Sequence, residues 1–155
     1  MKIELRLAQI GDLVSIQALF VETVDQVCSG DYNAEALRAW ISGASKADFW
    51  IDKLKRQYFL VAIHEERILG FASLENEDYV DLLYIHKDFQ RRGIADQLLT
   101  SIEREATRKS ISKLNADVSK TALGFFEKRG FIVVQEQSRI VEGMTIGNFR
   151  MEKLL

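Results

Sequence analysis

The chain of 155 residues contains no proline and a single cysteine, Cys28. One thiol cannot form an internal disulfide, so a disulfide-stapled secreted scaffold is excluded. Without proline-rich or low-complexity segments nothing marks a linker, and the length suits about one domain. No stretch approaches the roughly 20 apolar residues of a membrane span, and Met1–Glu4 lacks a signal-peptide pattern. We therefore expect one domain over residues 1–155, a cytoplasmic location and no membrane partner.

An excess of charge of one sign is also missing. The 21 Lys and Arg residues nearly balance the 23 Asp and Glu residues, giving a formal net charge of −2. Because this charge attracts no polyanion, nucleic acid is not an expected partner. His64, His86 and Cys28 stand apart from one another, without the spacing of metal ligands or of a nucleophile with its base. We expect no metal, and structural roles for these three residues.

The most informative segment is Val80–Leu99. It begins with an apolar run typical of a buried strand and continues through a polar turn at His86–Asp88. A helical pattern follows, since five apolar residues recur at a period near 3.6 and form one stripe. These residues are Ile94, Leu98, Leu99, Ile102 and Ala106. The segment therefore predicts a strand, a short turn and an amphipathic helix.

The sequence Gln-Arg-Arg-Gly-Ile-Ala, residues 90–95, lies where this helix begins. Its single glycine, Gly93, excludes the G-x-G-x-x-G and G-x-x-x-x-G-K-[ST] nucleotide motifs. The first turn of a helix has unpaired N–H groups and a positive dipole end, which together suit a phosphate. Two alternatives stay open: Gly93 eases a tight turn only, and Arg92 either contacts phosphate or is merely solvated.

Gln90, Gly93 and Ala95 match the pattern Q-x-x-G-x-A after a strand. This resembles the acetyl-CoA signature of the GNAT N-acetyltransferase superfamily. Ser119–Phe131 resembles the second signature of that family, so the resemblance covers roughly the second half of the chain. It implies an α/β (α+β) single-domain GNAT fold, with a mixed, mostly antiparallel central sheet flanked by helices. It also implies acetyl-CoA as co-substrate and no metal.

The resemblance assigns cofactor contacts to the backbone of the central strand, to the start of the helix and to the second signature. These residues are Leu83, Tyr84, Ile85, Gln90, Arg91, Arg92, Gly93, Ile94, Ala95, Asp96, Ser119 and Phe126. Phe126 stands where many relatives have a tyrosine that acts as general acid, and a phenylalanine cannot donate a proton. Ser119 stands where many have Asn, and it is also a candidate helix cap.

Acetyl transfer to an amine needs a base, because only on the order of one alkyl amine in a thousand is neutral at pH 7. Asp81 and Tyr79 alternate onto one face of the central strand, at positions where GNAT enzymes place a general base. Asp81 also has apolar neighbours, Val80 and Leu82. We expect Asp81 to be the base. The alternative is that it lies exposed at the end of the strand.

Four aromatic residues, Tyr32, Trp40, Phe49 and Trp50, fall in two short predicted helices that flank the acceptor pocket in the GNAT fold. By resemblance Tyr32, Trp40 and Trp50 are candidate substrate contacts; core packing is the alternative.

The expected function is acetyl-CoA-dependent transfer of an acetyl group to a primary amine of a small molecule or of a peptide or protein, directly and without a covalent enzyme intermediate. A non-catalytic acyl-CoA-binding or sensing module is the alternative, and a homodimer stays open.

The element order expected along the chain is βαααβββαβαββ. The expected strands are Lys2–Leu7, Tyr58–Ile63, Ile68–Leu74, the central strand from Val80 to the turn at His86, Lys113–Val118, Phe131–Gln135 and Thr145–Leu154. Three of the expected helices follow caps at Asp12, Asn33 and Ser45. A fourth begins at Ile94, and a fifth follows a cap at Ser119.

Overall fold

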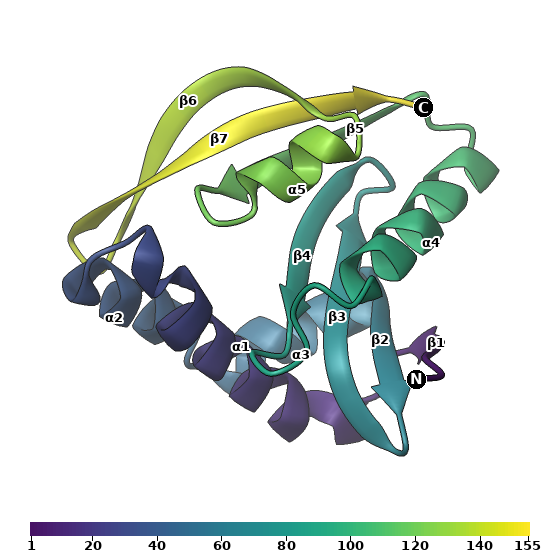
Figure 1. Cartoon of the computed structure of the whole chain (residues 1–155), viewed down its shortest axis with the longest axis horizontal. Helices are drawn as coiled ribbons and strands as arrows, with labels where there is room; N and C mark the ends of the chain where they lie inside the picture. Colours follow the sequence, from purple (N-terminus) through teal and green to yellow (C-terminus); the bar gives the residue numbers. More distant parts are fainter.

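The computed structural model describes all 155 residues and contains one seven-stranded sheet, in the order β1-β2-β3-β4-β5-β7-β6 (Figure 1). Neighbouring strands are antiparallel except β4 and β5, which are parallel. The strands are β1 (Glu4–Leu7), β2 (Tyr58–His64), β3 (Arg67–Glu75), β4 (Tyr79–Ile85), β5 (Lys113–Ser119), β6 (Ile132–Val141) and β7 (Met144–Leu154). The expected element order and the mixed, mostly antiparallel sheet are confirmed.

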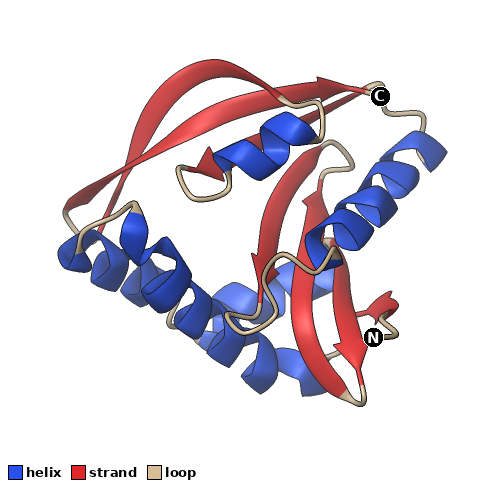
Figure 2. Ribbon diagram, in the orientation of Figure 1, coloured by secondary structure: helices blue, strands red, loops and turns tan.

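Five α-helices flank this sheet (Figure 2). They are α1 (Leu13–Val27), α2 (Ala34–Gly43), α3 (Ala47–Arg56), α4 (Ile94–Arg108) and α5 (Leu123–Lys128), with single 3₁₀ turns at Ile10–Asp12 and Cys28–Gly30. One apolar cluster joins α4 and α5 to the sheet, and a second joins α1, α2 and α3 to it. No helix is both long and apolar enough to cross a membrane.

The apolar stripe predicted for α4 is confirmed, since Leu98, Leu99 and Ile102 have no exposed surface. Full burial of each such side chain contributes roughly 1.5–3 kcal/mol, so this face fixes α4 against the sheet. The helix begins at Ile94, where the sequence pattern places it. Its first turn is therefore held in place by the residues that follow.

One of the three predicted caps of the early helices is confirmed. Asn33 caps α2 by accepting a hydrogen bond from the amide of Ala36 at 2.8 Å. Asp12 does not cap α1, because its carboxylate is bound by both Nη atoms of Arg6 and by the amide of Gln9. Ser45 does not cap α3, because its amide continues the end of α2 and the next helix starts two residues later, at Ala47.

Strands β4 and β5 pair over only two residues each, Tyr79 with Asn115 and Val80 with Ala116. Beyond these pairs β4 has no strand neighbour on that side, whereas β5 continues along β7. Between β3 and β4 the register shifts at Asp81, which is left as the extra residue of a β-bulge. The sheet is therefore open between β4 and β5, and the bulge at Asp81 bends β4 where this opening begins.

The β6–β7 hairpin arches from α5 to α2 and closes this opening from one side (Figure 1). Its strand β6 runs to Val141, so the prediction that it ends near Gln135 is wrong. The missed half is polar and lies at the edge of the sheet, where almost every residue is exposed. The hairpin turns at Gly143, with φ of +76°, and its tip packs Val141 against Gly43 of α2.

Candidate active site

A cavity of about 820 Å³ occupies the opening between β4 and β5. Its walls come from α1, α2 and α3, from the loop before α4, from α5 and from the β6–β7 hairpin. Most residues expected at the site line this cavity: Tyr32, Trp40, Tyr79, Asp81, Leu83, Tyr84, Ile85, Gln90, Arg91, Gly93, Ile94, Ala95, Asp96, Ser119 and Phe126. Arg92 and Trp50 do not. The chain has no cluster of three or more His, Cys, Asp or Glu side chains arranged to hold a metal ion.

The loop from Gln90 to the first turn of α4 presents unpaired backbone donors. No amide from Arg91 to Asp96 donates a hydrogen bond within the chain. The loop is held at its start by Gln90, whose Nε2 donates to the carbonyl of Ile85 at 2.7 Å. Gly93 has φ of +80°, a conformation that glycine adopts without strain. The result is a fixed turn with several N–H groups and the positive end of α4, an arrangement that suits phosphate.

Arg92 and Trp50 lie elsewhere. The Arg92 guanidinium is 5.0 Å from the ring centroid of Phe89, so its contact with a phosphate stays a prediction. Trp50 is fully buried, and its Nε1 donates to the carbonyl of Ala44 at 2.9 Å. The expectation that Trp50 contacts substrate is therefore wrong, and core packing is its role.

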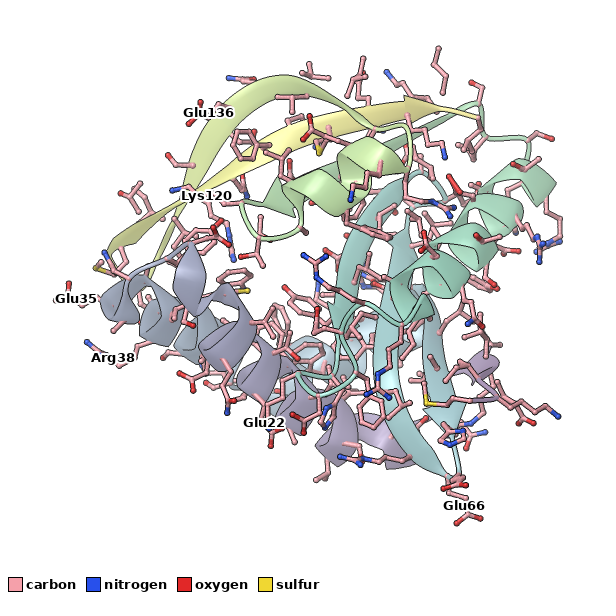
Figure 3. All side chains as sticks on the ribbon, in the orientation of Figure 1. Glu22, Glu35, Arg38, Glu66, Lys120 and Glu136 are labelled. Atoms are coloured by element: carbon pink, nitrogen blue, oxygen red, sulfur yellow. The ribbon has the colours of Figure 1, made fainter.

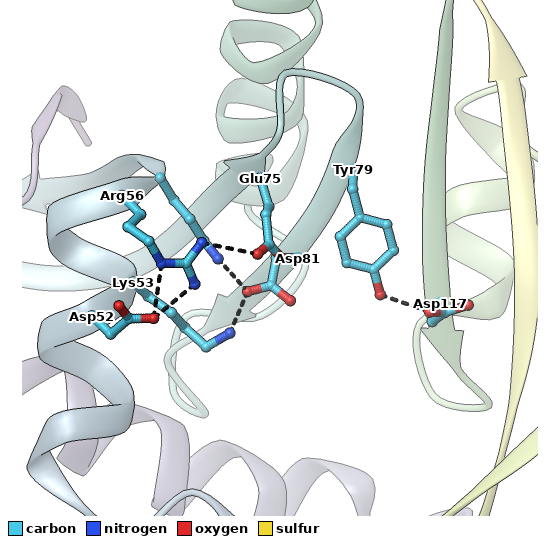
Figure 4. Close-up of polar contacts among 8 residues, drawn as sticks. Asp52, Lys53, Arg56, Glu75, Tyr79, Asp81 and Asp117 are labelled. Carbon is cyan, nitrogen blue, oxygen red and sulfur yellow. Dashed lines mark hydrogen bonds and ion pairs between the residues drawn. The ribbon is translucent and has the colours of Figure 1, made fainter.

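Asp81 lies in neither of the surroundings considered from the sequence, apolar or exposed at a strand end. Its Oδ2 accepts from Lys53 Nζ at 2.6 Å and from Gln57 Nε2 at 2.8 Å (Figure 4). The side chains of Asp81 and Lys53 are 16% and 14% exposed. No hydrogen bond within the chain reaches Oδ1 of Asp81, so this second oxygen stays available to a ligand or a water.

Tyr79 faces a different carboxylate. Its hydroxyl donates to Asp117 Oδ2 at 2.7 Å (Figure 4), and Asp117 Oδ1 accepts from Gln137 at 2.6 Å. Arg150 forms an ion pair with the same carboxylate at 3.4 Å. Burial, and then the bond to Asp117, raise the pKa of Tyr79 well above its usual range. Tyr79 therefore keeps its proton near neutral pH.

Two further tyrosines line the cavity with their protons retained, because burial raises the pKa of both Tyr32 and Tyr84. The Tyr32 hydroxyl is fully used: it donates to the Gly147 carbonyl at 2.6 Å and accepts from the Lys120 amide at 2.9 Å. The Tyr84 hydroxyl has no carboxylate or carbonyl partner within hydrogen-bond distance. Of the two, only Tyr84 has a proton free to donate.

The second signature region forms the wall opposite β4. Ser119 Oγ accepts from the amide of Ala122 at 3.1 Å in the turn that joins β5 to α5. The prediction that Ser119 caps this helix is wrong, because α5 begins at Leu123 and Ala122 is at its N-cap position. Phe126 is 4% exposed and packs edge-on against Phe125 and Phe131. Its ring borders the cavity and is fixed by the core.

Sequence reasoning missed several polar residues that line the cavity, and five of them bear on its chemistry. These are Lys53, Asp117, Gln137, Arg139 and Asn148. The sequence contains a signal for one of them, Lys53. It follows the aromatic Phe49 by four residues, and side chains at that spacing meet on one face of a helix. In the structure Lys53 Nζ lies 4.6 Å from the Phe49 ring centroid. The others depend on strand register, which no local pattern indicates.

Comparison with known proteins identifies the class to which this fold and cavity belong. A family model described as acetyltransferase (GNAT) domain matches residues 28–155. The chain belongs to the GNAT acetyltransferase family and is an N-acetyltransferase of that family. It is 34% identical over 149 residues to the N-acetyltransferase YafP of Escherichia coli K12, covering 96% of this chain and 94% of the relative.

Two solved structures extend the likeness. A GCN5-related N-acetyltransferase from Rhodopseudomonas palustris superimposes with a TM-score of 0.97 at 31% identity, over 100% of this chain and 97% of its own. The PaiA N-acetyltransferase from Thermoplasma acidophilum, solved in complex with coenzyme A, has a TM-score of 0.84 at 23% identity, with both chains fully covered. At that identity the second likeness shows the fold alone.

Proposed function

We propose that this cavity binds acetyl-CoA and that the protein transfers the acetyl group directly to a primary amine of a small molecule or of a peptide or protein. One observation carries the proposal: the unpaired β4 edge beyond Val80 and the unpaired amides of Arg91–Asp96 open into the same cavity. Phosphate suits those amides, and an extended pantetheine arm suits a free strand edge. When bound, acetyl-CoA supplies the acetyl group as a thioester.

Asp81 is the proposed general base. Oδ2 is held by Lys53 and Gln57, so the carboxylate is fixed while Oδ1 is free to accept a proton from the amine, directly or through a water. A proton acceptor of this kind helps to form the small fraction of neutral amine that reacts.

The free backbone of β4 and the Tyr84 hydroxyl are proposed for the two remaining roles, which are binding the oxyanion and protonating the leaving thiolate. N–H groups of Leu83 to Ile85 on the side that β5 has left are proposed to hold the developing oxyanion. Tyr84 is the proposed donor to the leaving thiolate. Because a thiol has a pKa near 8.5, protonation assists departure but is not required, which is consistent with Phe126 at the position of the family's tyrosine.

The experiment that tests this function measures free thiol released from acetyl-CoA by the purified protein with a panel of amines. Transfer predicts thiol release that depends on the amine, together with an acetylated product detected by mass spectrometry. Binding of acetyl-CoA without amine-dependent release from any panel member would favour the non-catalytic module instead. The matched pair of variants is Asp81→Asn and Asp52→Asn, because Asp52 is an exposed carboxylate on α3 that pairs with Arg56 outside the cavity (Figure 4).

A further inference from the structure

The part of the cavity between α2, α3 and the β6–β7 hairpin has one cation without a partner. Arg139, on β6 opposite Ile146 of β7, lines the cavity with its guanidinium 5.8 Å from the ring centroid of Trp40. It makes no ion pair within 4.0 Å and no hydrogen bond within the chain. All five N–H donors of this guanidinium are therefore available to a ligand.

The two carboxylates in this part of the cavity, Asp81 and Asp117, are each paired with a cation, and of those two cations only Lys53 lines the cavity. Lys53 is paired with Asp81 at 2.6 Å, and Arg150 is paired with Asp117 at 3.4 Å. Arg139 is close enough to the tyrosines of the wall to oppose the rise in pKa that burial causes in Tyr32 and Tyr84. Because both carboxylates already have a cation as partner, Arg139 is the charged group in this part of the cavity that remains free to bind an anion.

Two neighbouring features support a ligand in front of Arg139. The side chain of Arg139 is exposed, and the Trp40 ring beside it stands edge-on to the Tyr32 ring, with the two ring centroids 5.4 Å apart. Lys120, labelled in Figure 3, lies outside the cavity lining but close to it, with its Nζ 5.2 Å from the Tyr32 ring centroid, and it also makes no ion pair. Oδ1 of Asn148 is buried without a partner and belongs to a cavity-lining residue, so it can accept an N–H from the acceptor.

We propose that the acceptor amine carries an anionic oxygen group, a carboxylate or a phosphate, which Arg139 binds. A planar guanidinium matches either group through two parallel N–H···O bonds. The anion is then held at the hairpin while the amine of the same molecule points toward Asp81. This inference rests on the proposed function, since it names the class of substrate that the same cavity takes.

The test compares amines that differ only in the anion. Each amino acid is paired with its amide, and phosphoethanolamine is paired with ethanolamine, with thiol release from acetyl-CoA as the readout. We expect kcat/KM to be higher for the anionic member of the pairs that react, and the two series show whether carboxylate or phosphate is preferred. In Arg139→Gln this preference should fall about tenfold or more, through KM, while kcat/KM for the neutral member changes little.

Arg38→Gln is the matched control, because Arg38 is an exposed arginine of α2 outside the cavity and the change in net charge is the same (Figure 3). Its preference for anionic amines should equal that of the unmodified protein. Equal or greater kcat/KM for the neutral members, or equal losses in Arg139→Gln and Arg38→Gln, overturns the inference and leaves acetyl transfer intact. No thiol release with any amine counts against the proposed function itself, and the inference falls with it.

Discussion

Lys53 Nζ lies 2.6 Å from Oδ2 of Asp81, so the third helix is tied to the bulged residue of the central strand (Figure 4). Both side chains are largely buried, and Gln57 binds the same oxygen. The contact joins α3, which carries the cavity-lining Phe49, to β4, which carries the proposed base. One ion pair therefore fixes the position of Asp81 relative to the space in which an acceptor would bind.

Removal of this cation tests the structural part of the relationship. Lys53→Met keeps most of the aliphatic side chain but leaves the Asp81 carboxylate with only Gln57 as partner. We expect the free energy of unfolding at pH 7 to fall by about 1–3 kcal/mol, measured by urea denaturation, because an unpaired buried charge is costly. Lys55→Met is the control, since Lys55 is exposed on the same helix and makes no ion pair; an equal loss in both variants would contradict the explanation.

Gly93 gives a test of the proposed phosphate site. At a hundredfold excess over its dissociation constant, acetyl-CoA should stabilise the protein by about 2.7 kcal/mol. Gly93→Val should abolish that gain, because a branched side chain stands between the phosphate and the backbone amides and φ is +80°. The measurement is the shift in Tm on addition of acetyl-CoA.

A matched control separates strain from loss of the site. Gly143, at the hairpin turn, has φ of +76° and, like Gly93, nothing within 4 Å of an added Cβ. Both valine variants should lose roughly 1–2 kcal/mol of stability from the left-handed conformation, but only Gly143→Val should keep the acetyl-CoA shift. If Gly93→Val keeps it too, the site lies elsewhere.

The missing tyrosine of the second signature leads to a rescue experiment. Tyr84→Phe should lower kcat about tenfold, less than a typical general acid, because a thiolate leaves readily without a proton. Phe126→Tyr alone should leave kcat unchanged or raise it, and in the double variant it should restore part of the loss. A large loss of kcat in Phe126→Tyr with acetyl-CoA affinity intact would show that the ring lies away from the sulfur.

The ion pair between Arg6 and Asp12 should make the free energy of unfolding depend on pH in the acid range. The hydrogen bonds from Arg6 hold the pKa of Asp12 below its usual range. A carboxyl group whose pKa is lowered by folding stabilises the protein above its unfolded pKa of about 3.9 and loses that contribution as pH falls through the folded value. Asp12→Asn should therefore cost about 1 kcal/mol at pH 7 and progressively less below about pH 4.

The measurement for Asp12 is urea unfolding at neutral and at acid pH. Asp25→Asn is the control, because Asp25 is an exposed residue of α1 without an ion pair, and its variant should match the unmodified protein at both pH values. A cost of Asp12→Asn that is the same at pH 7 and pH 3 would show that the carboxylate charge is not what stabilises the turn.

Local patterns predicted the parts of the site that local forces build. The apolar stripe of α4 indicates where the helix begins. The suitability of Gln90–Ala95 for a phosphate could be predicted from its residue types and from the dipole of the helix. The bulge at Asp81 was not predictable, because it depends on how β3 pairs with β4 and a single charged residue between apolar neighbours does not indicate a register shift. The partner of Asp81 is likewise set by the tertiary packing of α3, because two strands, β2 and β3, separate this helix from β4 along the chain.

The two early tryptophans show the same limit. Trp40 and Trp50 lie on neighbouring short helices and are both strongly buried, at 8% and 0% exposure. Only Trp40 borders the cavity, because the hairpin and Tyr32 leave its ring accessible from that side, whereas Trp50 packs between Phe20 and Phe71. Sequence identifies both as core candidates but does not say which one a cavity reaches.

The most direct test of the central claim is the pH dependence of acetyl transfer in Asp81→Asn, compared with Asp52→Asn and the unmodified protein. The amide keeps the shape of the side chain but does not accept the proton. Near neutral pH we predict a rate lower by about 10²–10⁴-fold, with acetyl-CoA affinity unchanged, and a defect that shrinks toward high pH, where the amine loses its proton unaided. A small defect that is constant across the pH range would contradict the assignment of Asp81 as the base.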